Sequence, residues 1–547
     1  MLSAKDTIQS THDAFRWDIP EFYNIGVDVC DRWAECEPDR LAIIDVASTG
    51  EAKEHSFDDL RRASNRLANA LAHFVSQGDR VGVLLPQCFE TAASHVAIYK
   101  IGAIAQPLFT LFGPDALLYR LKDSGASTVI TNAAGVATLT ALRAELPDLK
   151  TVISMDGASD TALGFADLCA KQSETLTPLR TRADDPALLI YTSGTTGNPK
   201  GALHAHRVLL GHLPGVEMSH DFLPQSGDRM WTPADWAWIG GLLDVLLPAL
   251  HHGVPVVAHR FEKFTAKAAF ELIKTYNIQN AFLPPTALKM MRLWDGAEDM
   301  GISMRSVASG GEPLGRELID WGQRALGTTI NEFYGQTECN MIVSSCAALA
   351  PAEPGVMGFA VPGHRVEIID PESGELLGLG QQGDIAVSAP DPVMFLRYWN
   401  KPEATEAKFR EIDGVKWLLT GDQGCKTASG RIAFVGRDDD VINSSGYRIG
   451  PAEIEDCLLT HPAVHLAGAV GKADPVRGEI VTAFVQLAEG HTPNEALAMD
   501  IGAHVKARLA AYEYPREVHF IDSMPMTTTG KIMRGTLRSM LDQSSGA

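Results

Sequence analysis

The stretch Tyr191-Thr192-Ser193-Gly194-Thr195-Thr196-Gly197-Asn198-Pro199-Lys200-Gly201 follows the apolar run Ala187–Ile190, which is typical of a buried strand. Glycines let the backbone adopt positive φ and approach a ligand closely, and successive N–H groups with Ser and Thr hydroxyls form a nest for anions. Lys200 adds a positive charge for phosphate. The stretch therefore predicts a polyphosphate-binding loop. It is not a Walker A loop, because Asn198-Pro199 separates Gly197 from the lysine.

The length and composition limit the classes of protein to which the chain can belong. Its 547 residues are too many for one hydrophobic core and predict two or more domains. The net charge of −21 argues against a nucleic-acid partner and against binding to an anionic membrane. The eight cysteines include no C-x-x-C pair, which favours free thiols in a reducing compartment over a disulfide framework or a zinc site.

The N-terminus and the longest apolar stretch give no sign of a targeting or membrane segment. The N-terminus is acidic and has no apolar core of a signal peptide, so we expect a cytoplasmic protein. The apolar stretch Trp236–Ala258 is interrupted by Asp244, two histidines and several glycines and prolines. It therefore predicts a buried helix, Gly241–Leu250, followed by a core strand, Val254–Ala258, and no membrane span.

Helix and strand patterns alternate in the first part of the chain, which predicts a mostly parallel sheet with helices on both faces. The expected helices are Leu60–Leu71, Phe89–Lys100, Ala266–Tyr276 and Pro285–Met291, and the expected strands are Arg80–Leu85, Gly102–Leu108 and Asn280–Leu283. Short strands at Val366–Asp370 and Gly383–Val387, separated by glycine-rich turns, indicate a β subdomain after Phe359.

A second change of pattern after Val435 indicates a separate domain of ordinary size. The elements expected there are the helices Ala452–Leu459 and Ala496–Leu509 and the strands Val464–Val470, Val481–Gln486 and Val518–Phe520. The mutually repelling Asp438-Asp439-Asp440 favours an exposed boundary. We therefore predict an α/β fold with a large N-terminal domain of mixed and parallel sheets, residues 1–438, and a small C-terminal α+β domain, residues 439–547.

Seven sequence strings occur in one order along the chain: Tyr191–Gly201, Ala308–Pro313, Asn331–Glu338, Trp417–Asp422, Gly436–Asp439, Ser444–Gly450 and Met524–Arg534. Together they resemble the motifs of the adenylate-forming superfamily, which includes acyl-CoA synthetases, adenylation domains of peptide synthetases and firefly-type luciferases. Tyr512–Glu517 and the last string look most like the short- and medium-chain acyl-CoA synthetase branch. The resemblance implies a large domain that binds AMP and a small, mobile domain with the catalytic lysine.

The resemblance also implies which residues contact ATP. Tyr334 offers a flat face for the base, and Asp422 offers two carboxylate oxygens to the ribose hydroxyls. The full set of nucleotide-binding residues implied in this way is Thr192, Ser193, Gly194, Thr195, Thr196, Gly197, Lys200, Gly311, Glu312, Pro313, Glu332, Phe333, Tyr334, Gly335, Gln336, Thr337, Asp422, Arg437, Arg448 and Lys531.

Three of the matched positions imply catalytic roles. Lys531 matches the adenylation lysine, whose ammonium stabilises the negative charge that develops when a carboxylate attacks the α-phosphate. Thr337 matches an α-phosphate contact, and Glu338 a ligand of Mg²⁺. Asp439 matches the hinge between the two domains, and Ser445-Gly446 lies at the predicted CoA tunnel.

The acyl pocket is expected at Trp238, Ile239, Gly240, Gly310 and Gly335. In acetate-specific members of the superfamily, side chains occupy the positions of the three glycines, so this chain is expected to have a longer cavity. Since each buried methylene contributes about 0.8 kcal/mol, an apolar cavity favours short- and medium-chain, branched or aryl acids over acetate. Trp236 has no evident role.

The sequence thus predicts an AMP-forming acyl-CoA synthetase with Mg²⁺ as cofactor and ATP, CoA and a carboxylic acid as substrates. Three alternatives stay open: a stand-alone enzyme that loads a carrier protein, an acetyl- or propionyl-CoA synthetase, and a non-catalytic nucleotide-binding protein. The last is disfavoured because Lys531, Glu338 and Asp422 are all present. A homodimer is compatible with this interpretation.

Overall fold

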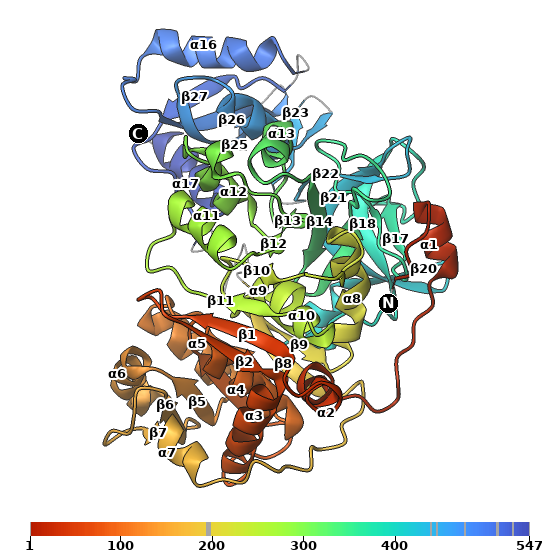
Figure 1. Ribbon diagram of the computed structural model, residues 1–547. Helices are drawn as coiled ribbons and strands as arrows, with labels where there is room; N and C mark the ends of the chain where they lie inside the picture. Colours follow the sequence, from red (N-terminus) through yellow and green to blue (C-terminus); the bar gives the residue numbers. More distant parts are fainter. Residues whose placement is uncertain are drawn as a thin grey trace.

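The computed structural model describes residues 2–192, 199–437, 440–444, 447–474, 477–509, 513–527 and 530–545. Within these ranges the strands form four sheets with helices packed around them, which confirms the predicted α/β fold class. In Figure 1 the orange helices and strands lie at the bottom and the blue C-terminal elements at the top. Across the described ranges, every helix is too short or too polar to cross a membrane.

The first sheet contains the alternating unit predicted from the sequence. Its strands, in spatial order, are β19 (Arg397–Tyr398), β9 (Lys200–Ala205), β8 (Pro186–Thr192), β4 (Ile104–Pro107), β3 (Arg80–Leu84), β5 (Thr128–Thr131), β6 (Thr151–Ser154) and β7 (Leu163–Gly164). The helices beside it are α3 (Phe57–Leu71), α4 (Phe89–Lys100), α5 (Pro114–Ser124), α6 (Ala133–Leu142) and α7 (Phe165–Ala170). Val83 of β3 packs in one core with α3 and α4, and Leu84 in another core with α5 and α6. Helices therefore cover both faces, as expected from strand alternation.

The second sheet lies next to the first and shares a core with it. Its strands, in spatial order, are β16 (Phe359–Ala360), β15 (Cys339–Ser344), β14 (Ile330–Gln336), β13 (Ser306–Gly310), β12 (Asn280–Phe282), β10 (Met230–Trp231), β11 (Val256–Ala258), β1 (Leu41–Val46) and β2 (Ala52–Ser56). Its helices are α8 (Val208–Ser219), α11 (Ala266–Thr275), α12 (Pro285–Arg292) and α13 (Arg316–Ala325). Ile43 of β1 and Val83 of β3 belong to the same buried cluster, so both sheets form one large domain core.

The carboxyl ends of β10, β12, β13 and β14 meet at one edge of the second sheet because these strands run parallel. The turn at Gly311 follows β13, and Thr337 follows β14. In parallel α/β sheets, ligands bind outside the carboxyl ends of the strands. Two of the seven strings are therefore brought to one edge.

The third sheet is the predicted β subdomain and is antiparallel. Its strands are β17 (Val366–Ile369), β18 (Gln382–Ala389), β21 (Val415–Lys426), β20 (Phe409–Ile412) and β22 (Ile432–Arg437). Asp422 lies inside β21 and opposite Arg437 of β22. The strand continues through the glycine at 421, whose φ is +75°, and past Asp422 to Lys426.

The fourth sheet consists of strands from the C-terminal part of the chain. They are β24 (Tyr447–Ile449), β23 (Ile442–Ser444), β26 (Gly478–Leu487), β25 (Val464–Asp474) and β27 (Glu517–Phe520), with helices α15 (Pro451–Leu459), α16 (Glu495–Lys506) and α17 (Arg534–Ser545). Two buried clusters, one around Ile454 and one around Leu537, consist of residues from this part of the chain alone. A separate core is what an independent domain requires, although the predicted boundary at Asp439 lies outside the described residues.

The remaining helices are α1 (Ile8–Ala14), η1 (Val27–Asp31), α2 (Arg32–Cys36), η2 (Arg143–Glu145), α9 (Ile239–Gly241), η3 (Leu242–Leu246), α10 (Leu247–His251), η4 (Glu298–Met300) and α14 (Pro402–Glu406). The predicted helix Gly241–Leu250 corresponds to α9, η3 and α10 in succession, and η3 is π-helical. Such π-helical segments often lie at functional sites. Trp236, which precedes them, is 1% exposed and belongs to the large domain core.

Candidate active site

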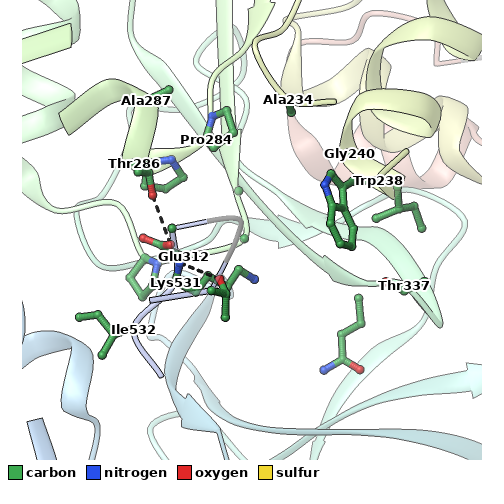
Figure 2. A pocket seen from close by; sticks show the side chains of 18 of the residues that line it. Ala234, Trp238, Gly240, Pro284, Thr286, Ala287, Glu312, Thr337, Lys531 and Ile532 are labelled. Atoms are coloured by element: carbon green, nitrogen blue, oxygen red, sulfur yellow. Dashed lines mark hydrogen bonds between the residues drawn. The ribbon is translucent and has the colours of Figure 1, made fainter. Parts of the chain in front are cut away.

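A cavity of about 1670 Å³ is lined by residues of all four sheets. Its walls include described residues of six of the seven strings, among them Thr192, Lys200, Gly311, Glu338 and Lys531. Figure 2 shows the arrangement: Lys531, Ile532 and Glu312 lie on one side, and Trp238 and Gly240 lie on the other. The tertiary structure thus brings most of the sequence-predicted residues to one cavity.

The string Ser444–Gly450 is the exception among the seven. The described residues that line the cavity include none from it, whereas the neighbouring Pro451 and Ala452 do line the wall. Ser193, Gly194, Thr195, Thr196, Gly197, Asp439, Ser445 and Gly446, and the side chain of Arg448, lie outside the described residues. Their predicted roles therefore stay predictions.

Lys531 enters the cavity from the C-terminal part of the chain. Its backbone N–H donates a hydrogen bond to Oγ1 of Thr527 over 3.0 Å, and its ammonium lies 3.8 Å from where a methyl group at Gly311 would stand. The surrounding walls lower the pKa of Lys531 by desolvation, while Glu312, the nearest opposing charge, acts to raise it. The side chain nevertheless remains accessible to solvent through the cavity.

Glu312 occupies the turn opposite Lys531. Its Oε1 accepts a long hydrogen bond of 3.5 Å from Thr286 Oγ1, drawn in Figure 2, and Lys289 lies 3.9 Å from its other oxygen. Burial raises the pKa of Glu312, while Lys289 and Lys531 act to lower it. The turn thus places a carboxylate where it interacts electrostatically with the ammonium of Lys531.

Asp422 lies at the junction of the second and third sheets. Its Oδ2 accepts hydrogen bonds of 2.6 Å from the hydroxyl of Tyr334 and 2.6 Å from Nε2 of Gln336. Burial raises the pKa of Asp422, and Tyr334, Arg437 and Gln336 oppose that rise. Because both donors use Oδ2, the described residues leave Oδ1 as the oxygen for an incoming hydroxyl.

Glu338 has a partner that the sequence interpretation missed. The hydroxyl of Tyr398, on the short strand β19, donates a hydrogen bond to Oε1 of Glu338. Lys408 also lines the cavity, donates to the carbonyl oxygen of Thr420 over 3.0 Å and interacts electrostatically with Glu338. No local motif distinguishes Tyr398 or Lys408, so sequence alone gave no sign of either.

Glu332 is a buried carboxyl group in the cavity wall, 6% exposed. Its Oε1 accepts a hydrogen bond of 3.4 Å from the backbone N–H of Leu314. Burial raises the pKa of Glu332 to about 8, and Asp456 of the C-terminal part adds to the rise. Burial thus favours the protonated form of this carboxyl group.

The expected acyl-pocket residues all line the cavity, but the reasoning from the glycines is corrected. A methyl group at Gly240 would lie 2.7 Å from Cε1 of Phe282, and one at Gly310 would lie 2.7 Å from Cε2 of Phe333. At Gly335 it would lie 2.3 Å from the backbone nitrogen of Met341. The protein itself therefore fills the space that the missing side chains leave, and two phenyl rings become part of the wall.

Trp238 forms an aromatic cluster with Phe109 and Phe112, which follow β4 of the first sheet. Its ring lies 5.6 Å from that of Phe109 and 5.7 Å from that of Phe112. Trp236, by contrast, is absent from the described cavity wall and lies in the core. Aromatic rings thus line part of the acyl end of the cavity.

Comparison with known proteins identifies the family. Residues 30–399 match the family model described as AMP-binding enzyme, and residues 453–531 match the AMP-binding enzyme C-terminal domain. The mitochondrial acyl-coenzyme A synthetase ACSM4 of Mus musculus is 34% identical over 534 residues, which cover 95% of this chain and 91% of that protein. The acetyl-coenzyme A synthetase of Bacillus subtilis (strain 168) is 33% identical over 527 residues, covering 94% and 90%.

A solved structure agrees with these matches along nearly the whole chain. The anthranilate CoA ligase AuaEII in complex with anthranoyl-AMP superposes with a TM-score of 0.87 at 27% identity, covering 97% of this chain and 99% of that one. The chain therefore belongs to the AMP-binding enzyme family and is an AMP-forming acyl-CoA synthetase, with ATP and CoA as substrates.

Proposed function

We propose that the protein joins a carboxylic acid larger than acetate to CoA in two half-reactions in this cavity. First, a carboxylate oxygen of the acid attacks the α-phosphorus of ATP, and the bond to pyrophosphate breaks. Second, the CoA thiolate attacks the carbonyl carbon of the acyl-adenylate, and AMP leaves with the electrons of the broken C–O bond. The observation that carries this proposal is the position of Lys531 beside Gly311 and Glu312 in a cavity that also contains Glu338 and Asp422.

Each residue role follows from the group it can present. The Lys531 ammonium stabilises charge on the phosphoryl oxygens more in the transition state than in the ground state, and Thr337 donates its hydroxyl to the α-phosphate. Asp422 accepts from the ribose through Oδ1, and Tyr334 both fixes that carboxylate and presents a ring to the base. Lys200 and the loop before it bind the outer phosphates.

Glu338 is the proposed ligand of Mg²⁺. In the described part of the chain, no three His, Cys, Asp or Glu side chains are grouped so that they could bind a metal ion by themselves. Tyr398 donates to Oε1 of Glu338, so the carboxylate would offer Oε2 to the ion. This fits Mg²⁺, which is commonly bound by one or two carboxylates together with substrate phosphates. When bound, the ion would neutralise charge on the phosphates.

The second half-reaction requires the C-terminal domain, residues 439–547, to change its orientation. We infer rotation about Asp439, which withdraws Lys531 and brings Ser445 and Gly446 to the CoA tunnel. The separate cores around Ile454 and Leu537 support this inference, because a unit with its own core can move as a body. The cytoplasmic location and the homodimer remain predictions.

The aromatic walls support an acid larger than acetate. Phe282, Phe333 and Trp238 offer flat apolar surface, which contributes binding energy in proportion to the area buried. The similarity to an anthranilate CoA ligase supports an aryl acid, and the similarity to an acetyl-coenzyme A synthetase keeps acetate as the second candidate.

A panel of acids tests the function. Acetate to decanoate, benzoate and phenylacetate are each assayed for pyrophosphate release with ATP, and for thioester with CoA. We expect acid-dependent pyrophosphate release and thioester with free CoA, with the highest kcat/KM for an acid larger than acetate. Adenylate without thioester would favour carrier-protein loading, and no pyrophosphate with any acid would contradict the proposal. The highest kcat/KM for acetate would contradict the proposed acid class alone.

A further inference from the structure

A hydrogen-bonded pair of polar side chains, Asp244 and Asn340, lies in the cavity wall. Asp244 belongs to η3, one turn after Gly240, and its exposed fraction is 3%. Asn340 lies two residues beyond Glu338, and its Oδ1 is 2.6 Å from where a methyl group at Gly335 would stand. The pair therefore lies directly beside the turn that presents Thr337 and Glu338.

The hydrogen bonding of the pair leaves one carboxyl oxygen for a ligand. Nδ2 of Asn340 donates to Oδ1 of Asp244 over 2.7 Å. Oδ2 of Asp244 lies 3.6 Å from the position of a methyl group at Gly240, on the side where Phe282 also contacts that glycine. Within the described ranges, Asn340 is the one side chain that hydrogen-bonds to this carboxyl group.

The surroundings favour the neutral form of Asp244. Burial raises the pKa of Asp244 well above its ordinary value, and the hydrogen bond from Asn340 opposes that rise. No charged residue in the described part of the chain contributes to the shift. A neutral carboxyl group has an O–H donor as well as acceptor oxygens, and leaving such a group without a partner in an apolar wall is unfavourable.

We propose that the Asp244–Asn340 pair binds a neutral hydroxyl or amino substituent of the substrate, and that the enzyme's acid is a hydroxy- or amino-substituted aromatic carboxylic acid. This inference rests on the proposed function, because it assigns the acid that the acyl pocket receives. The ring of the acid packs against Phe282, Phe333 and Trp238, which line the same cavity as the pair. Figure 2 shows Trp238 and Gly240 on this side of the cavity, away from Lys531.

A neutral substituent suits the site better than an ammonium group. An alkylammonium would require Asp244 to ionise inside an apolar wall, where the solvation of both charges is lost. A phenol or an aromatic amine is uncharged at neutral pH and can exchange hydrogen bonds with the carboxyl group at no such cost. A methyl group in the same place would leave Oδ2 of the carboxyl group without a partner.

The test measures pyrophosphate release with ATP alone, so that it reports the first half-reaction. The substrates are benzoate and its hydroxy, amino and methyl derivatives at each ring position. For the wild-type protein we expect one ring position at which the hydroxyl or amino acid exceeds the methyl acid in kcat/KM by about tenfold or more. Sites built to bind a substrate hydroxyl can discriminate still more strongly. A wild-type preference for the methyl acid at every position would overturn the proposal.

Two variants of Asp244 separate a substrate contact from a structural link. Asp244→Leu should reverse the preference, raising kcat/KM for the methyl acid and lowering it for the hydroxyl or amino acid. Asp244→Asn keeps the shape and both kinds of hydrogen-bonding atom, so it should keep part of the preference even if the leucine variant folds poorly. Asp235→Asn is the matched control, because Asp235 is another carboxyl of the wall whose Oδ1 accepts from the backbone of Ala237 over 2.8 Å. In this control, the ratio of kcat/KM for the hydroxyl or amino acid to kcat/KM for the methyl acid should match that of the wild type.

The outcomes distinguish the two levels of the proposal. If unsubstituted benzoate or an alkanoate is activated well, and the ratio is the same in the wild type and the folded Asp244 variants, the assignment of the pair is wrong and the proposed function stands. If no acid of any class gives pyrophosphate, both are wrong. Release of pyrophosphate with a shift of the ratio on Asp244→Leu supports both.

Discussion

The hydroxyl of Tyr334 donates a hydrogen bond of 2.6 Å to Oδ2 of Asp422, joining β14 of the second sheet to β21 of the third. The two residues are far apart in the chain, and both are almost fully buried. The bond fixes the carboxylate that is proposed to bind the ribose, so ATP binding depends on contact between the two sheets.

Tyr334→Phe should therefore weaken ATP binding. A hydrogen bond to an ionised group contributes about 1.5–3 kcal/mol, so we expect the KM for ATP to rise about tenfold or more. The KM for CoA should change little, because CoA enters after pyrophosphate has left. Steady-state pyrophosphate release against ATP concentration gives the result, and equal changes in both KM values would contradict the assignment.

Lys531→Ala should nearly abolish the first half-reaction while sparing the second. Loss of one such charge stabiliser typically costs about 10²–10³-fold in rate. Acyl-adenylate formation is followed by pyrophosphate release, and thioester formation is followed from a supplied acyl-adenylate with CoA. Lys289→Ala is a control, because it removes a nearby ammonium that lies 3.9 Å from Glu312. Equal losses in the two half-reactions would rule out a lysine that serves one step.

Asp439→Pro should uncouple the half-reactions. Proline fixes φ near roughly −65°, so a hinge residue could no longer change its torsion angles. Adenylate formation should persist, and transfer to CoA should fail. If both rates stay near those of the wild type, the hinge lies at another residue.

Glu332→Gln should make stability less sensitive to pH. The native pKa of Glu332, about 8, lies above its ordinary 4.5, so the native state binds more protons than the unfolded state between these values. The free energy of unfolding of the wild type therefore falls as pH rises through this window, by at most about 1.4 kcal/mol per pH unit from this group. The free energy of unfolding of the variant, relative to that of the wild type, should therefore rise from pH 5 to pH 8.

Urea unfolding without nucleotide measures this difference at several pH values. Glu271→Gln, an exposed carboxyl on α11, is the control and should follow the wild-type curve. Parallel curves for Glu332→Gln and the wild type would contradict the assignment of the buried proton to Glu332.

Gly240→Ala should displace the ring of Phe282, which lies 2.7 Å from the position of the new methyl group. Overpacking of this kind costs about 1–3 kcal/mol, and the displaced ring narrows the acyl end of the cavity. We expect a lower free energy of unfolding and a shift of preference toward smaller acids. Gly113→Ala, where the methyl group would meet nothing within 4 Å, should leave the acid preference unchanged.

Local sequence patterns were enough to predict much of the fold. The predicted helix Phe89–Lys100 agrees with α4 at both ends, because its boundaries depend on neighbouring residues. The order of the strings led to the family, which the comparisons confirm. The turn at Gly311, whose φ is +94°, forms from residues of its own string, so its presence could be predicted without knowing what packs against it.

Only the tertiary structure decided which side chains from distant segments contact the residues of these strings. Tyr398 lies 60 residues from Glu338, and Asn340 lies 96 residues from Asp244, and no pattern within either segment indicates the other. Gly240 is a further example. The sequence shows that a side chain is missing there, but only the structure shows that Phe282 fills the space. The sequence by itself therefore determined the family and its chemistry. The shape and polarity of the acyl pocket were determined by the fold, because hydrogen bonds and packing between distant segments depend on the order of the strands in the sheets.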